Sequence, residues 1–321
     1  MPAPAVRLPP RLRRGDRIAA LALSSPFPQD SFDAGLAVLR SWGLEPVPLV
    51  HPPAAPLGYL AGSDEQRAGA LDVMLRDPGI AGIYCARGGY GITRMLHLVD
   101  WRPLRERPCA IAGFSDVTAL HLAALCHAGV GGLHTPLLTS LTAGTERARE
   151  EAAVAAARED TRRLLLEGEA PVLRADAAGM RRSGTGGWDV VDGPLLVANL
   201  SKLTALVGTP DMPALEGWIL LLEDVNERPY RVDRMLTQLL RAGTLAGVVG
   251  VAAGDFSAPR AATGPEPSAE DVFVERLAPL GIPLATGFSV GHIARNEPAI
   301  IGARYSFDAR DGTISPLQSL E

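Results

Sequence analysis

The stretch AIAGFSDVTALHLAAL, residues 110–125, carries the clearest structural pattern in the chain. An apolar run stops at Gly113, Ser115 follows, and an apolar pattern with helical spacing begins at once. This order predicts a buried strand, a tight turn and a helix that ends at Gly129, because glycine commonly stops helices. Gly113 suits the turn because glycine adopts backbone angles that other residues avoid.

Ser115, on the corner of this turn, has two interpretations. A serine before a helix is usually an N-cap, whose oxygen accepts a backbone N–H from the first turn. The alternative is a nucleophile elbow, in which the turn presents the hydroxyl to a substrate. The usual elbow has a glycine two residues after the serine, where this chain has Val117, so the match is partial. A base and an orienting acid elsewhere in the chain would favour the second interpretation.

The rest of the first 140 residues repeats this alternation of apolar runs and amphipathic stretches. Apolar runs typical of buried parallel strands are RIAALAL (17–23), GIYCA (82–86) and CAIAGF (109–114). Apolar residues recur at helical spacing in residues 33–42, 64–75 and 116–128. Strands and helices in this order predict an α/β domain whose parallel sheet is covered by helices.

A change of pattern after residue 146 predicts three parts. These are an N-terminal domain (1–146), a connecting helix and linker (147–187) and a C-terminal domain (188–321). In the last part the strand-like runs are WILLLEDV (218–225), GVVGVAAGDF (247–256) and IPLATGFSVGH (282–292). A helical pattern spans 230–241, and a hairpin should turn at Asp311 and Gly312. The C-terminal domain is therefore expected to be mixed and richer in strands.

Composition predicts a globular protein that neither enters membranes nor binds nucleic acid. The chain has 321 residues, 47% of them hydrophobic, and no apolar run long enough to cross a bilayer. The formal net charge of -5 argues against nucleic acid, because proteins that bind its phosphates concentrate Lys and Arg. The first apolar stretch follows charged residues and is shorter than the core of a signal peptide, which predicts a cytoplasmic protein.

The three cysteines, Cys85, Cys109 and Cys126, form no CxxC motif and favour reduced, buried thiols. Cys85 ends a strand beside a glycine loop and is an alternative nucleophile. The sequence contains neither HExxH nor a cluster of His and Cys at metal-ligand spacing. We therefore predict that the protein uses no metal and no other cofactor.

Three reactive side chains follow predicted strands: Ser115 after AIAGF, Glu223 at the end of WILLLE, and His292 after ATGFSVG. Ligand sites of α/β proteins gather at the carboxyl ends of strands. A histidine can take the proton of a serine and return it to the leaving group, while a carboxylate orients the imidazole. The order Ser, Glu, His is also that of the α/β-hydrolases. The three residues therefore form a candidate catalytic triad.

The acid and the base of this triad each have another interpretation. Glu223 can form a structural ion pair with Arg228 or Arg231, and His292 can hydrogen-bond the backbone of a loop. His134, in GGLHTP, is a competing base.

A tetrahedral intermediate also needs hydrogen-bond donors for its oxyanion. Gly88 and Gly89 follow a strand in CARGGYG, where backbone N–H groups can approach a ligand closely. The N–H of Asp116, next to Ser115 at a helix N-terminus, is the other candidate donor. A phosphate-binding loop is the alternative, but the stretch lacks both GxGxxG and a Walker lysine.

Several ordered motifs, spread over nearly the whole chain, resemble the LD-carboxypeptidases, the S66 family of serine peptidases. The motifs are YLAGSDEQRAGAL, ARGGYGITRML, AGFSDVTALHLA, NLSKLTALVGTP, LLLEDVNERPYRVDRMLTQL and GFSVGH. The resemblance implies that Ser115 is the nucleophile and that Glu223 and His292 complete the triad. It also implies a Rossmann-like (flavodoxin-like) N-terminal domain, a smaller β-rich C-terminal domain, a site between them and usually a homodimer.

The chain departs from the family pattern at two places. Phe114 stands where tyrosine is usual in the turn, which is a mild change. Val197 and Ala198 stand where the family commonly has a glycine pair before NLSKL. The second departure affects the backbone near that loop and the fit of the substrate.

The resemblance implies a metal-independent serine carboxypeptidase that acts on murein peptides. Such an enzyme cuts an L,D-peptide bond and releases the terminal D-alanine of a murein tetrapeptide during cytoplasmic peptidoglycan recycling. Within the family, the alternative is a microcin C-type self-immunity hydrolase of peptidyl-nucleotide antibiotics, with Trp188 as the candidate aromatic for stacking on adenine. From another class, the alternative is a non-catalytic protein that binds a small ligand.

An exopeptidase must also bind a free carboxylate beside the scissile bond. A guanidinium offers two parallel, charge-assisted hydrogen bonds to such a group. Arg87 adjoins the glycine turn, and Arg228 and Arg231 closely follow Glu223. We predict that one of these three arginines binds the carboxylate.

Overall fold

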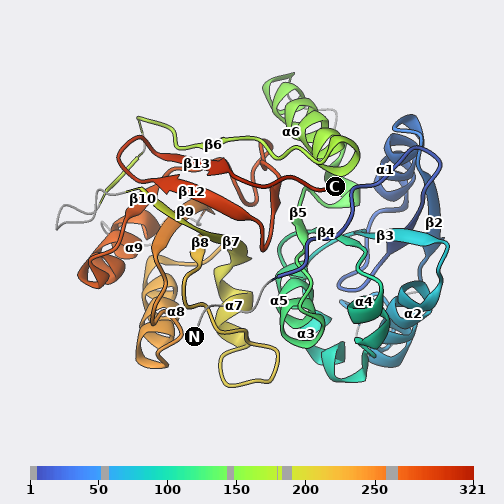
Figure 1. The fold of residues 1–321 in the computed structure, drawn as a ribbon, viewed down its shortest axis with the longest axis horizontal. Coiled ribbons are helices and arrows are strands. Elements are labelled where there is room, and N and C mark those ends of the chain that lie inside the picture. Colours follow the sequence, from blue (N-terminus) through green and yellow to red (C-terminus); the bar gives the residue numbers. More distant parts are fainter. Residues whose placement is uncertain (1–5, 52–57, 143–147, 179, 183–189, 258–266) are drawn as a thin grey trace.

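The computed structural model describes residues 6–51, 58–142, 148–178, 180–182, 190–257 and 267–321. These residues form two β-sheets with helices packed around them, and Figure 1 shows the two sheets side by side. The α/β class predicted from the sequence is therefore confirmed. Within the described residues, no helix combines the length and the apolar composition needed to span a membrane.

The first sheet has six strands in the order β11-β5-β4-β3-β1-β2. The pairs among its first five strands along the chain are parallel, as predicted, whereas β11 pairs antiparallel with β5. The strands are β1 (Arg17–Leu21), β2 (Glu45–Leu49), β3 (Ile80–Cys85), β4 (Ala110–Gly113), β5 (Leu133–His134) and β11 (Ala299–Ile300). A strand from near the C-terminus thus completes the N-terminal sheet. A two-residue strand has no periodicity, so the sequence pattern did not indicate it.

Helix α5 is the element that joins the two halves of the molecule. Its apolar residues cover nearly every face, and the helix contacts α3 and α4 in the first half and α7 in the second. A helix that is apolar all round needs such burial. It ends at Gly129 in the left-handed conformation, as predicted. The helices concerned are α1 (Gln29–Ser41), α2 (Asp64–Arg76), α3 (Ile92–Met95), α4 (Arg102–Glu106), α5 (Val117–Ala128) and α7 (Leu200–Ala205).

The second sheet has seven strands in the order β10-β9-β8-β7-β12-β13-β6. Strands β7 to β10 are parallel, and β12, β13 and β6 are antiparallel, so this half is mixed as predicted. The strands are β6 (Leu173–Arg174), β7 (Val191–Asn199), β8 (Ile219–Val225), β9 (Gly250–Ser257), β10 (Leu284–Thr286), β12 (Arg304–Asp308) and β13 (Thr313–Pro316). The remaining helices are α6 (Ala148–Glu167), α8 (Pro229–Arg241) and α9 (Ala269–Leu277).

Two features of this half differ from the sequence prediction. Strand β7 was not predicted, because Gly193 and Pro194 interrupt its apolar run. The run IPLATGFSVGH is a strand only at β10. From Gly287 to His292 the chain is irregular, although Phe288 and Val290 still form backbone hydrogen bonds to β9. Other predictions are confirmed: α8 begins at Pro229, and β12 and β13 form the hairpin across Asp311 and Gly312.

Candidate active site

Ser115 lies on the sharp turn between β4 and α5 and has a left-handed backbone conformation, with φ of 66°. This conformation costs a non-glycine residue about 1–2 kcal/mol, and such strain clusters at functional sites. Gly113, with φ of 152°, makes the turn possible, since a Cβ there would lie 3.0 Å from Val117 Cγ2 and 3.1 Å from Cys85 Cβ. The N-cap of α5 is Asp116, so Ser115 does not cap the helix.

His292 lies between Ser115 and Glu223. Its Nε2 is 3.0 Å from Ser115 Oγ, and its Nδ1 is 2.7 Å from Glu223 Oε2. The three side chains come from distant parts of the chain: the turn after β4, the strand β8 and the loop after β10. The arrangement can move a proton from the serine to Nε2 while Nδ1–H donates to the carboxylate.

Glu223 is fully buried, and its Oε1 accepts a hydrogen bond from Asn199 Nδ2 at 3.1 Å. Burial raises the pKa of Glu223 because the charged form loses hydration, although its bonds to His292 and Asn199 favour the charged form. Arg231 lies 3.5 Å from Glu227 instead of pairing with Glu223. Sequence reasoning missed Asn199, although this residue also ends a strand.

The competing base, His134, and the competing nucleophile, Cys85, are both buried. His134 Nε2 lies 2.9 Å from Asn296 Oδ1, and burial lowers the pKa of His134 to about 4. Burial raises the pKa of the Cys85 thiol to about 12, so the thiol stays protonated at neutral pH. Phe114 packs against both histidine rings, with centroids 5.5 Å from His134 and 4.7 Å from His292.

Replacing His134 with glutamine should preserve turnover and reduce the loss of stability in acid. The native state holds His134 neutral, whereas the unfolded chain binds a proton below a pH of about 6.5. This contribution to stability is therefore complete above that pH and is lost as the pH falls toward 4, at about 1.4 kcal/mol per pH unit. Urea unfolding at pH values of about 7, 5.5 and 4.5 measures the difference. Parallel stability profiles, or turnover abolished at neutral pH, would contradict this assignment.

Gly88 packs directly against the nucleophile. A Cβ at this position would lie 2.9 Å from Ser115 Cβ and 3.0 Å from Ser115 Oγ. The backbone of the loop is fixed where Ser25 N–H donates to the Gly88 carbonyl at 3.3 Å. Among the described residues, the N–H groups of Gly88, Gly89 and Asp116 have no hydrogen-bond acceptor. Gly88 and Gly89 line a pocket together with Ser115, whereas Asp116 is not among the described residues that line it.

Replacing Gly88 with alanine should lower kcat/KM by about 10²-fold to 10³-fold, because the added methyl group displaces Ser115 Oγ from its productive position. The backbone of Gly88 is not in the left-handed region, so any change of the unfolding midpoint comes from the contact with Ser115 and not from backbone strain. Gly69→Ala is the matched control, because a Cβ at Gly69 meets nothing within 4 Å. Kinetics and thermal unfolding of both variants provide the measurement; wild-type kcat/KM in Gly88→Ala would disprove the contact.

A pocket of about 530 Å³ opens beside these residues, and a second pocket of about 640 Å³ adjoins it. The first pocket is lined by Ser115, the glycine loop, Asn199 and the start of α7. The second continues toward α6, and the two share Phe114, Thr139, Ser140 and His292. Space for a ligand thus lies on both sides of His292.

The three candidate arginines lie in different places. Arg87 lines the first pocket and donates to the Pro26 carbonyl at 2.6 Å. Arg228 and Arg231 are not among the described residues that line either pocket. The side chain of Lys202, which sequence reasoning did not consider, lines the first pocket.

The remaining sequence predictions concern metal binding, the pair Val197 and Ala198, and Trp188. Among the described residues, no group of three His, Cys, Asp or Glu side chains is placed to hold a metal ion. Val197 and Ala198, which replace the usual glycine pair, are buried in β7. Trp188 lies outside the described residues.

Comparisons with known proteins match both halves of the chain. The family model of the LD-carboxypeptidase N-terminal domain matches residues 18–135, and that of the LD-carboxypeptidase C-terminal domain matches residues 192–307. A putative carboxypeptidase of Streptomyces coelicolor is 37% identical over 96% of this chain and 95% of its own length. The murein tetrapeptide carboxypeptidase of Pseudomonas aeruginosa is 33% identical over 88% of this chain and 89% of its own length.

A solved structure leads to the same family. The muramoyltetrapeptide carboxypeptidase from Oxalobacter formigenes superposes with a TM-score of 0.76 and 26% identity, over 93% of this chain and 97% of that one. Both halves of the chain match, and the relatives are covered almost in full. The chain therefore belongs to the LD-carboxypeptidases, the S66 family of serine peptidases.

Proposed function

We propose that this protein releases the terminal D-alanine from murein tetrapeptides, with Ser115 as nucleophile, His292 as general base and Glu223 as the acid that orients it. The observation that carries the proposal is the pair of hydrogen bonds, 3.0 Å and 2.7 Å long, that links these side chains. Membership of the LD-carboxypeptidases supports cleavage of an L,D-peptide bond.

In the proposed mechanism, Ser115 Oγ attacks the carbonyl carbon of the L,D bond while His292 Nε2 takes the hydroxyl proton. Negative charge develops on the carbonyl oxygen, where the N–H groups of Gly88, Gly89 and Asp116 can donate to it. The carbon–nitrogen bond breaks as His292 returns its proton to the amine, so D-alanine leaves. Water then attacks the acyl-serine, His292 accepts its proton and returns it to Oγ, and the shortened peptide is freed as a carboxylic acid.

The two adjoining pockets support a peptide substrate. They meet at Phe114, Thr139, Ser140 and His292, so a chain bound across the triad has space on both sides of the scissile bond. A homodimer and a cytoplasmic location are part of the same proposal and rest on the family resemblance and the sequence alone. Light scattering of the purified protein tests the dimer, and fractionation of the native host tests the location.

Mass spectrometry of the protein incubated with murein tetrapeptide, murein tripeptide and a peptidyl-adenylate tests the substrate. We expect the tetrapeptide alone to lose D-alanine, and we expect this to continue after exhaustive chelation because the triad supplies the nucleophile without a metal. Cleavage of the peptidyl-adenylate alone would favour the antibiotic hydrolase. If no substrate is cut and a serine-reactive phosphonate does not label Ser115, the protein is a non-catalytic binder.

A further inference from the structure

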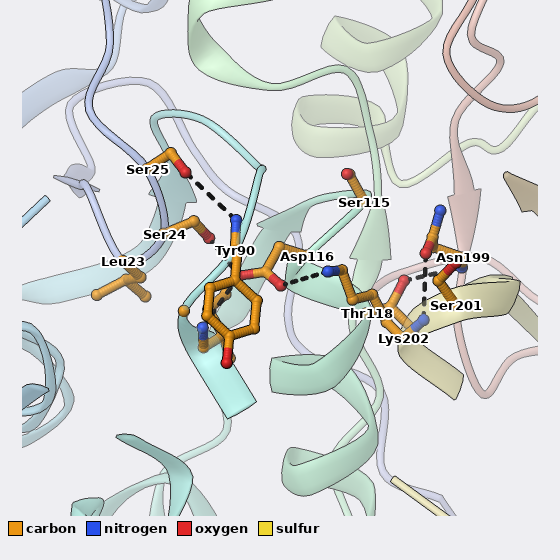
Figure 2. Close-up of polar contacts among 12 residues, drawn as sticks. Leu23, Ser24, Ser25, Tyr90, Ser115, Asp116, Thr118, Asn199, Ser201 and Lys202 are labelled. Atoms are coloured by element: carbon orange, nitrogen blue, oxygen red, sulfur yellow. Dashed lines mark hydrogen bonds and ion pairs between the residues drawn. The ribbon is translucent and has the colours of Figure 1, made fainter. Parts of the chain in front are cut away.

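Lys202 is the only lysine among the 31 lysine and arginine residues of the chain. It lies in the first turn of α7. Its side chain extends from α7 toward Asp116, the residue that follows Ser115, as Figure 2 shows. A chain that has arginine at every other strongly basic position thus has lysine beside its nucleophile. Since the two side chains differ in shape and hydrogen bonding, this choice requires a physical reason.

The ammonium group of Lys202 is held between an acid and an aromatic ring. Its Nζ lies 3.4 Å from Asp116 Oδ1 and 5.4 Å from the centroid of the Tyr90 ring. Asp116 is fully buried, and its Oδ2 accepts hydrogen bonds from Ser24 Oγ at 2.8 Å and Ile92 N–H at 3.0 Å. Its Oδ1 has no hydrogen-bond partner among the described residues. Lys202 is therefore the counter-charge of Asp116, and its N–H donors are not all used.

Lys202 is also the less exposed of the two cations described in the lining of the first pocket. The Lys, Arg, Asp and Glu residues described there are Arg87, Lys202, Asp224 and Glu227. Asp224 is buried and accepts several hydrogen bonds, and Glu227 lies 3.5 Å from Arg231. Arg87 is exposed, whereas the Lys202 side chain is only 19% exposed. Lys202 is therefore the more buried of the two cations described in this pocket.

We propose that Lys202 binds a carboxylate of the substrate next to the scissile bond. The proposal rests on the proposed function, because an exopeptidase has its substrate carboxylate within one residue of the scissile bond. Nζ–H donates to the carboxylate in a charge-assisted hydrogen bond while Asp116 holds the ammonium group in place. Two carboxylates fit this chemistry: that of the terminal residue, and that of an acidic side chain on the residue before it.

The geometry explains why this residue is lysine. An ammonium group is compact and has three N–H donors, so one can point at Asp116 Oδ1 while another points into the pocket. A guanidinium is planar and pairs with a carboxylate through two parallel bonds, so an arginine here would turn its donors toward Asp116. We therefore expect Lys202→Arg to restore the charge but not the selectivity.

Calorimetric binding to the Ser115→Ala protein tests the proposal without turnover. The three probes are a murein tetrapeptide, its C-terminal amide, and a tetrapeptide whose third residue lacks a side-chain carboxylate. Each is titrated into Ser115→Ala and into versions that also carry Lys202→Met or Lys202→Arg. Arg87→Met in the same background tests the other cation that lines the first pocket. Adding Asp116→Asn to Lys202→Met removes the unpaired buried acid, in case the single change impairs folding.

With Lys202 present, either the amide or the tetrapeptide without the third-residue carboxylate should bind about 10-fold to 150-fold more weakly than the unmodified tetrapeptide. This is the range expected for a hydrogen bond between charged groups. Lys202→Met should remove this difference by weakening the tetrapeptide alone, and Arg87→Met should leave it intact. A difference for the amide identifies the terminal carboxylate as the ligand. A difference for the third-residue probe identifies the side-chain carboxylate.

Two results would overturn the proposal. Either Lys202→Met weakens the binding of all three probes by the same factor, or it leaves the binding of all three unchanged. The first result means that Lys202 serves only as the counter-charge of Asp116. Turnover by the unmodified protein is measured separately. An active protein with either result contradicts only the role of Lys202, whereas a protein that cuts no tetrapeptide contradicts the proposed function itself.

Discussion

Replacing Ser115 or His292 with alanine should lower kcat for the murein tetrapeptide by about 10⁴-fold to 10⁶-fold. The serine change removes the attacking oxygen, and the histidine change removes the base that lies 3.0 Å from that oxygen. The unfolding midpoint of Ser115→Ala should stay near that of wild type, because this change removes only the hydroxyl group. Steady-state kinetics and thermal unfolding of the two variants measure these effects.

The double variant distinguishes a triad from two independent contributions. Groups that act as a unit are lost together, so Ser115→Ala with His292→Ala should be little slower than either single variant. Ser140→Ala is the matched control, because this serine lines the same pocket without a hydrogen bond to His292. Losses that multiply, or a slow Ser140→Ala variant beside an active Ser115→Ala variant, would refute the assignment.

Replacing Glu223 with glutamine should lower kcat by about 10⁴-fold with the geometry preserved. The glutamine Oε1 would still accept from Asn199 Nδ2, so its amide nitrogen would face His292 Nδ1. An N–H donor at this place requires the tautomer that carries its proton on Nε2, and that nitrogen then cannot accept the Ser115 proton. Kinetics over a range of pH measure the loss, with Glu216→Gln on the exposed surface as control. Activity near wild type would exclude Glu223 as the orienting acid.

The same variant should gain stability as it loses activity. Burial raises the pKa of Glu223 in the native state, so its stabilising contribution is present below the ordinary value of about 4.5 and is lost as the pH rises. At neutral pH the wild type therefore keeps an unfavourable buried charge that glutamine does not have. The unfolding midpoint of Glu223→Gln should exceed that of wild type by an amount that grows over the pH range above about 4.5. A difference that shrinks over this range would contradict the direction of the shift.

Part of this site was predictable because its signals come from residues that are close together in the sequence. The turn around Gly113 and Ser115 needs a glycine, an apolar strand before it and an apolar helix after it, and all three lie within sixteen consecutive residues. Helix α8 and the β12–β13 hairpin were predicted for the same reason, because Pro229 and the pair Asp311 and Gly312 are local signals. Glu223 and His292 were singled out because each closes an apolar run.

What the sequence did not contain is the packing between distant segments. Ser115 and His292 are 177 residues apart, and only the contact between the two halves of the chain decides that they meet. Packing also decided which cation lines the pocket: among the three arginines only Arg87 does, within the described residues, and Lys202 joins it. Strand β11 is set by backbone pairing with β5, which leaves no hydrophobic pattern to detect.

The late position of β11 and His292 in the chain has a consequence for biosynthesis. A ribosome delivers Ser115 long before the histidine that activates it, so a growing or prematurely terminated chain carries a nucleophile without a base. The edge of β5 also stays unpaired until Ala299–Ile300 emerges, and an open strand edge invites association with other chains. The base of the triad and the last strand of the first sheet therefore become available together, when residues 292–300 emerge.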